Sequence, residues 1–326
     1  MKMGEGIVKS NRVYLWDNLK ILLITFVVIH HASIPYVVIK GQHWTEDLYM
    51  LIMPYTMSTF TIISGYWFKP RPLGVLVKRY LLPCMLMVFL IYGIRSFEPN
   101  APSLQYYRWR LDIMWYLWVL FFYCLITPKL LKCNLNVLLA SSVLLSLVAG
   151  LFPAIGGTFA LARMIGFYPF FLMGIKMRDS RQFNEWVNDK NAVRWARIIF
   201  ITIMVLYFAY FSYNRGIHLF ISFSHHYDGN WHAMPYRLFT YLVCAALSVA
   251  LIVSMPNKQY WFTKYGSRSM TPYILHPLLL YTFSFNLAIP IMDKWYGYVF
   301  YMLVIPALSM MTVHSRIDGF VKKMTS

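Results

Sequence analysis

The sequence has few charged residues, and acidic ones are especially scarce. Only 13% of its 326 residues are charged, with 12 acidic side chains against 30 lysines and arginines. Hydrophobic residues make up 59% of the chain, and the mean hydropathy is +0.52. A soluble domain cannot bury so much apolar surface, whereas a bilayer can hold it. The composition therefore argues against a soluble enzyme and predicts a polytopic membrane protein.

Cysteine is also sparse, and its spacing matches neither a disulfide framework nor a metal site. The four cysteines are scattered, and most lie in or beside apolar runs, where a free cysteine acts as a small apolar residue. The histidines of the segment 215–232 match no standard zinc pattern. We therefore expect no disulfide, no metal site and no bound cofactor.

Ten apolar runs are long enough to cross a membrane, which takes about 17–25 residues of helix. Backbone groups in lipid must be satisfied within a segment, and the alternating pattern of a membrane barrel is lacking. We therefore predict an all-α polytopic membrane bundle of about ten transmembrane helices. The predicted spans are 14–36, 47–68, 79–96, 113–131, 136–153, 158–177, 195–214, 234–254, 268–290 and 296–314.

Lysine and arginine are distributed unequally between the two sides of this ten-helix arrangement. With loops assigned alternately, 21 of them lie on the side of both termini and 7 on the other, leaving Lys20 and Arg163 inside spans. Cytoplasmic loops are enriched in these residues, so we expect both termini to be cytoplasmic. The net charge of +18 then needs no nucleic-acid partner. A single membrane domain is predicted over 14–314, between cytoplasmic tails at 1–13 and 315–326.

The first predicted span carries ionisable side chains in the stretch WDNLKILLITFVVIHHAS. At about 100° per residue, Lys20 and His31 share one face about 16 Å apart, with Asp17 near that face and His30 turned away. Ionisable groups inside spans usually serve a function, and histidine can act as a general base near neutral pH. Two alternatives stay open: a helix-end hydrogen bond for His31, and a structural ion pair between Asp17 and Lys20.

A basic cluster follows the second predicted span, in the stretch PRPLGVLVKRYLLP. Its members are Arg71, Lys78 and Arg79. Anchoring by the positive-inside rule accounts for them, and phosphate binding is the sharper alternative because arginine and helix starts favour anions.

Further candidates lie in three other predicted spans. The candidates are Trp115 and Tyr116, then Arg163, then Ser269, Tyr273 and His276 at about one-turn spacing. Each could contact a substrate. The alternatives are an aromatic belt for the first pair, an ion pair for Arg163, and a histidine that only packs between helices for the last group.

Taken in order, these blocks resemble the acyltransferase-3 family of membrane acyltransferases, and its fucose 4-O-acetylase-like branch most of all. The resemblance covers about residues 14 to 290. It rests on LWDNLKILLITFVVIHHAS, FTIISGYWFKP, KRYLLP, IMWYLWVLFF, RMIGFYPFFLMGIK and GSRSMTPYILHPLLL. In that family the first helix carries a basic residue, ten intervening positions and a histidine, which correspond here to Lys20 and His31. Most relatives have arginine first, so Lys20 is a departure that removes bidentate anion binding.

The resemblance implies transfer of an acyl group, usually acetyl from acetyl-CoA, to a hydroxyl of an envelope or extracellular carbohydrate, free or lipid-linked. The expected partners are the bilayer of a bacterial inner or plasma membrane, acyl-CoA, the acceptor and, as an open option, a second copy of the chain. A carbohydrate exporter or flippase on the same fold is the alternative function.

The resemblance also suggests roles for the candidate residues. His31 would act as the base or take the acetyl group transiently, with Asp17 and Lys20 setting the electrostatics between the donor and acceptor sides. The basic cluster would bind CoA phosphates. The acceptor would be held or its site supported by Trp115, Tyr116, Arg163, Ser269, Tyr273 and His276.

Overall fold

The computed structural model describes residues 13–40, 44–97, 111–213, 223–227, 229–284 and 294–325. All regular elements in these ranges are helices, which confirms the all-α prediction. The longer ones are α1 (Tyr14–Lys40), α2 (Trp44–Tyr66), α4 (Leu82–Arg95), α6 (Trp115–Leu130), α7 (Leu135–Ala149), α8 (Leu161–Arg178), α10 (Lys190–Tyr213), α11 (Met234–Ser254), α12 (Met270–Ser284) and α15 (Ser315–Thr325). The shorter ones are α3 (Leu73–Leu76), η1 (Val77–Leu81), η2 (Asp112–Met114), η3 (Thr158–Ala160), α9 (Arg181–Trp186), η5 (Trp231–Ala233), η6 (Thr263–Arg268), α13 (Trp295–Val299), η8 (Phe300–Val304) and α14 (Ile305–Met311).

Several of these helices are long and apolar enough to cross a membrane. Within the described ranges they number 5, or 6 if the bent pair Trp295–Met311 and Ser315–Thr325 is one span. Shorter apolar helices include α6 and α7. The chain is therefore a multi-pass membrane protein, while the ten-span count and the side of the termini stay predictions. Some loop residues used in those predictions, including residues 1–12, 98–110 and 214–222, lie outside the described ranges.

The third predicted span starts earlier than expected. We placed its start at residue 79, but helix begins at Leu73, directly after Pro72. Proline is tolerated there because the first helical turn needs no N–H donor from it. The turn Val77–Leu81 is then a π-helix, just before Pro83 at the start of α4. Because Pro83 lacks an N–H, the wider turn is the local adjustment that lets the helix continue.

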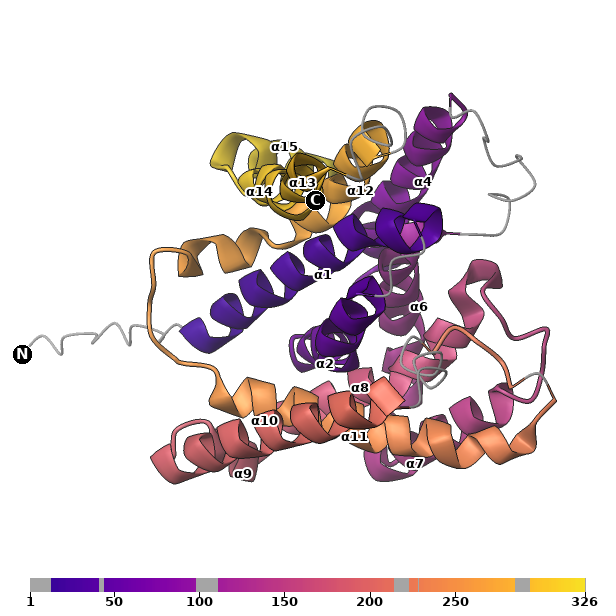
Figure 1. Ribbon diagram of the computed structural model, residues 1–326. Coiled ribbons are helices and arrows are strands. Elements are labelled where there is room, and N and C mark those ends of the chain that lie inside the picture. Colours follow the sequence, from indigo (N-terminus) through magenta and orange to yellow (C-terminus); the bar gives the residue numbers. More distant parts are fainter. Residues whose placement is uncertain are drawn as a thin grey trace, which may run out of the picture.

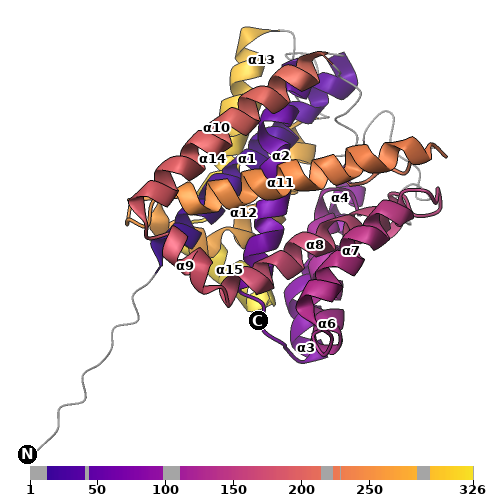
Figure 2. The ribbon, with the colours of Figure 1, turned by 90° about the horizontal axis from the view of Figure 1, so that it is seen from below.

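Two helices, α1 and α2, run through the middle of the bundle (Figure 1). Helix α1 packs against α2, α12 and α14, whereas α2 also packs against α8, α10 and α11. The C-terminal helices α12 to α15 gather on one side of this central pair, and α7 to α11 gather on the other. Figure 2 shows α10 and α11 covering the central pair from below. The first helix thus meets the last third of the chain along its own length.

Glycines let α2 and α8 approach closely. A Cβ atom on Gly65 would lie 1.9 Å from the carbonyl oxygen of Phe171, and one on Gly174 would lie 2.0 Å from that of Ile62. No side chain fits at either position. The Ser-Gly pair at 64–65 therefore serves close helix packing, as small residues do in membrane bundles.

The segment after residue 314, which we expected to be a tail, forms the amphipathic helix α15. Its Asp318 is buried, accepts a hydrogen bond of 2.8 Å from the Thr271 hydroxyl and lies 2.7 Å from the Lys322 ammonium group. The carboxylate therefore joins α15 to α12. Helix α15 also contacts the η1 turn.

Candidate functional site

The candidate site centres on two histidines from distant parts of the sequence. Nδ1 of His31 in α1 lies 3.0 Å from Nε2 of His276 in α12. The two rings stack, with centroids 5.1 Å apart and planes 18° apart. His276 is fully buried, whereas His31 stays partly exposed. One ring is therefore a support inside the bundle, and the other can meet a substrate.

The contact between α1 and α12 depends on how the chain approaches α12. A Cβ atom on Gly266 would lie 2.1 Å from the carbonyl oxygen of Asp17, so η6 packs directly on the backbone of α1. The Asn18 amide donates hydrogen bonds to the carbonyls of Pro256 and Lys258, and its oxygen accepts one from the Thr263 hydroxyl. These contacts at the start of α1 fix η6 and, through it, the position of α12.

His30 faces a different neighbour from His31. Its ring packs 4.9 Å from that of Tyr49 in α2, centroid to centroid. Within the described part of the chain, Nδ1 of His30 is buried without a hydrogen-bond partner. Helical geometry predicted that the two side chains diverge. In the structure His31 turns to α12 and His30 turns to α2.

A row of aromatic rings leads from the histidines to Arg163. Tyr273 lies 5.9 Å from His276, and Tyr116 lies 5.9 Å from Tyr273, both measured between ring centroids. Trp115 continues the row 5.7 Å from Tyr116. The guanidinium carbon of Arg163 then lies 4.9 Å from the Trp115 ring, a cation–π contact. The structure therefore brings together five of the predicted residues around His31.

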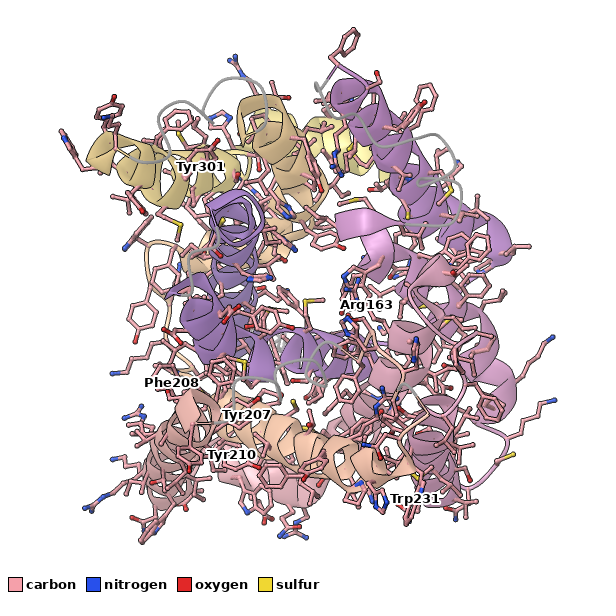
Figure 3. The ribbon with its side chains drawn as sticks, turned by 45° about the vertical axis from the view of Figure 1, so that its right-hand side comes forward. Arg163, Tyr207, Phe208, Tyr210, Trp231 and Tyr301 are labelled. Carbon is pink, nitrogen blue, oxygen red and sulfur yellow. The ribbon has the colours of Figure 1, made fainter. Side chains whose placement is uncertain are left out.

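Hydrogen bonds hold the tyrosines of this row in place. The Tyr116 hydroxyl lies 3.0 Å from that of Ser64 in α2, and the Tyr273 hydroxyl donates to the carbonyl of Ile113 at 2.9 Å. Figure 3 shows the side chain of Arg163 turned toward the middle of the bundle. Its positive charge acts electrostatically on both His30 and His31. Aromatic faces, a cation and a partly exposed imidazole are thus combined in one region.

Three other predicted residues lie nearer the start of α1. The Lys20 ammonium group is 2.9 Å from the Asp17 carboxylate, with side chains 24% and 11% exposed. Such a pair in the first turns matches the structural alternative, since an acidic residue also suits a helix start. His31 lies about 16 Å further along the helix axis. Ser269 lies at the end of η6, where its carbonyl accepts a 3.4 Å hydrogen bond from the Tyr273 amide.

The basic cluster lies in and just before the π-helical turn. Arg71 precedes α3, and Lys78 and Arg79 belong to η1, which contacts α6 and α15. Lys78 and Arg71 are exposed. Nε of Arg79 is buried, and the described residues offer it no hydrogen bond. Arg71 and Lys78 are therefore accessible to an anion, and the half-buried Arg79 lies beside Lys78 with an Nε–H that has no partner among the described residues.

Sequence reasoning missed Asn18 and Tyr49. The signal for Asn18 was its place in WDNLK, a polar residue directly after Asp17 in an otherwise apolar helix. Its hydrogen bonds go to residues about 240 positions away, which no local pattern can indicate. Tyr49 carried no signal, because aromatic residues abound in this chain.

In the comparison with known proteins, the family model of acyltransferase-3, described as an acyltransferase domain, matches residues 13–314. No curated protein and no solved structure matches the chain.

Proposed function

Because the chain belongs to the acyltransferase-3 family and is a membrane acyltransferase, we propose that it transfers an acetyl group from acetyl-CoA to a carbohydrate hydroxyl. The acceptor belongs to the cell envelope or is extracellular, and the membrane is a bacterial inner or plasma membrane. One observation carries this proposal: a partly exposed imidazole, His31, is held by hydrogen bonding against the buried His276 inside the helical bundle. Ionisable groups at such places usually serve a function.

In the proposed reaction His31 is the general base. The imidazole takes the proton of the acceptor hydroxyl as the oxygen attacks the thioester carbon, so a carbon–oxygen bond forms and the carbon–sulfur bond breaks. CoA leaves as the thiolate, and the proton held by His31 returns to it as the thiol. An imidazole can both accept and release a proton, which suits the uptake and the return of this proton.

The donor enters at the basic cluster in this proposal. Arg71, Lys78 and Arg79 bind the phosphates of CoA from the cytoplasmic side, where charge-assisted hydrogen bonds to phosphate are strong. The buried Nε of Arg79, which has no hydrogen bond among the described residues, supports this assignment. The Asp17–Lys20 pair belongs to the same helix as His31 and shapes the electrostatic potential between the donor site and the acceptor site.

The acceptor is held by Arg163 in this proposal, since arginine donates hydrogen bonds to sugar hydroxyls. Arg163 is half-buried, and the buried rings of Trp115, 4.9 Å away, and Tyr116 support it. Ser269 and Tyr273 support the α12 side of the site.

The test is acetylation of envelope polysaccharide by membranes that contain the protein and receive labelled acetyl-CoA. We expect label in the polysaccharide with the wild type and none above background with His31→Ala. A carbohydrate exporter would give another pattern: loss of surface polysaccharide in its absence, with acetylation of the remaining polysaccharide unchanged. That outcome would replace the transferase proposal by the exporter alternative.

A further inference from the structure

The surroundings of His276 restrict which of its ring nitrogens carries a proton. Its Nδ1 lies 2.9 Å from the carbonyl oxygen of Pro272, one turn earlier in the chain. The ring also interacts with the carbonyl of Tyr273. That carbonyl lacks its usual helical donor, because the residue four positions later is Pro277, which has no N–H. Carbonyl oxygens only accept hydrogen bonds, so Nδ1 of His276 must donate.

This restriction passes to His31 through their shared hydrogen bond. A neutral imidazole with a proton on Nδ1 has a lone pair on Nε2, so Nε2 of His276 is an acceptor. Nδ1 of His31, which is 3.0 Å away, is then the donor. By the same rule Nε2 of His31 carries the lone pair. No hydrogen bond within the described ranges occupies that nitrogen.

We infer that His276 is a positioning residue whose bond to the Pro272 carbonyl sets the tautomer of His31, leaving Nε2 of His31 as the atom that accepts the substrate proton. The catalytic meaning of this inference rests on the proposed function, whereas the tautomer itself does not. When His31 becomes positively charged, its Nδ1–H still points at a neutral acceptor. His276 therefore orients the base before proton transfer and stabilises the cation after it.

His30 supports this assignment by contrast. It is the neighbouring histidine in the same helix, yet its Nδ1 is buried without a hydrogen bond in the described part of the chain. No hydrogen bond at this nitrogen sets its tautomer as the Pro272 carbonyl does for His276. The sequence alone offers two adjacent histidines, and only one of them has a partner that prepares it as a base.

The test is ¹⁵N NMR of histidine-labelled full-length protein in nanodiscs, with the His31 signals assigned by their loss in His31→Gln. We expect the proton of wild-type His31 on Nδ1, and a shift of population to Nε2–H in His276→Leu. In His276→Gln the side-chain oxygen can still accept from Nδ1 of His31, so the wild-type tautomer should largely return. His314→Gln, at an exposed position, should leave the His31 signals unchanged.

The kinetic arm uses the same variants with labelled acetyl-CoA. We expect kcat to fall about a hundredfold or more in His276→Leu and to recover in part in His276→Gln, with KM for acetyl-CoA unchanged. A proton on Nε2 of wild-type His31 would overturn the inference even if His276→Leu failed to fold. Transfer activity with an unchanged tautomer in His276→Leu would also overturn it while leaving the proposed function intact. Absence of transfer in the wild type would reject the function but not the tautomer.

Discussion

The α-carbon of Gly266 lies against the backbone of Asp17, so close that a Cβ atom there would be 2.1 Å from the Asp17 carbonyl oxygen. This contact joins the start of α1 to η6, which leads directly into α12. Since His31 belongs to α1 and His276 to α12, the packing of Gly266 bears on the distance between the two rings.

Gly266→Ala is therefore expected to lower stability and transfer activity together. Neither backbone can yield cheaply, and forcing extra atoms into a packed site costs about 1–3 kcal/mol. The midpoint of thermal unfolding in detergent should fall. Gly319→Ala is the matched control, because a Cβ atom at Gly319 in α15 would meet nothing within 4 Å. If Gly266→Ala were as stable as the wild type, the role given to this contact would be contradicted.

The Asp17–Lys20 pair offers a second prediction. Lys20→Met should lower the free energy of unfolding by about 1–3 kcal/mol, because it removes the cation 2.9 Å from a carboxylate that is only 11% exposed. The double variant Asp17→Asn/Lys20→Met should recover most of this loss, since no charge is then left behind. Denaturation of the purified variants measures both effects.

The same variants separate structure from catalysis at this pair. If the double variant regains stability and wild-type transfer rate, the pair is structural. A rate that stays low after stability returns would assign the pair an electrostatic part in transfer. Equal stability of the single and double variants would show that Lys20 does not compensate the Asp17 charge.

Much of this architecture could be predicted from sequence because membrane helices are recorded locally, in the length and polarity of apolar runs. The face shared by Lys20 and His31 also followed from helical spacing, as did the divergence of His30. The partner of His31 could not be predicted in this way. Its identity depends on contacts such as Gly266 against Asp17 and Asn18 against the carbonyl of Pro256, which join segments far apart in the chain.

Two further features lay beyond local rules. The start of the third span was misplaced because proline is tolerated at a helix start, so Pro72 does not prevent the helix from beginning at Leu73. The segment after residue 314, predicted as a cytoplasmic tail, is the helix α15, and its packing depends on the contact of buried Asp318 with Thr271, which no local pattern indicates.

The fucose 4-O-acetylase-like branch stays a prediction.

Donor binding gives a third prediction. Arg79→Gln should raise KM for acetyl-CoA about ten- to hundredfold with little change in kcat, because hydrogen bonds to charged groups contribute about 1.5–3 kcal/mol. Initial rates at varied acetyl-CoA concentration measure this. Lys132→Gln is the control, an exposed residue on the same predicted side of the membrane. If KM for acetyl-CoA were unchanged in Arg79→Gln, the assignment of the basic cluster to the donor site would be wrong.

Acceptor binding gives a fourth prediction. Arg163→Met should raise KM for the carbohydrate about tenfold or more and leave KM for acetyl-CoA unchanged, because the cation 4.9 Å from Trp115 is lost. Arg163→Lys keeps a cation, so its KM for the carbohydrate should lie between those of the wild type and Arg163→Met. Lys294→Met removes an exposed positive charge on the predicted acceptor side and should have no effect. If Arg163→Met instead raised KM for acetyl-CoA, Arg163 would have to be assigned to the donor site.

The central claim is that His31, and not its neighbour, is the base. The most direct measurement compares initial rates of acetyl transfer by purified His31→Gln and His30→Gln in proteoliposomes supplied with labelled acetyl-CoA and acceptor polysaccharide. The two substitutions are chemically identical and adjacent in one helix, so general damage to the bundle should affect both. We predict transfer reduced to background in His31→Gln and retained within a fewfold in His30→Gln. Retained transfer in His31→Gln, or equal loss in both, would contradict the account.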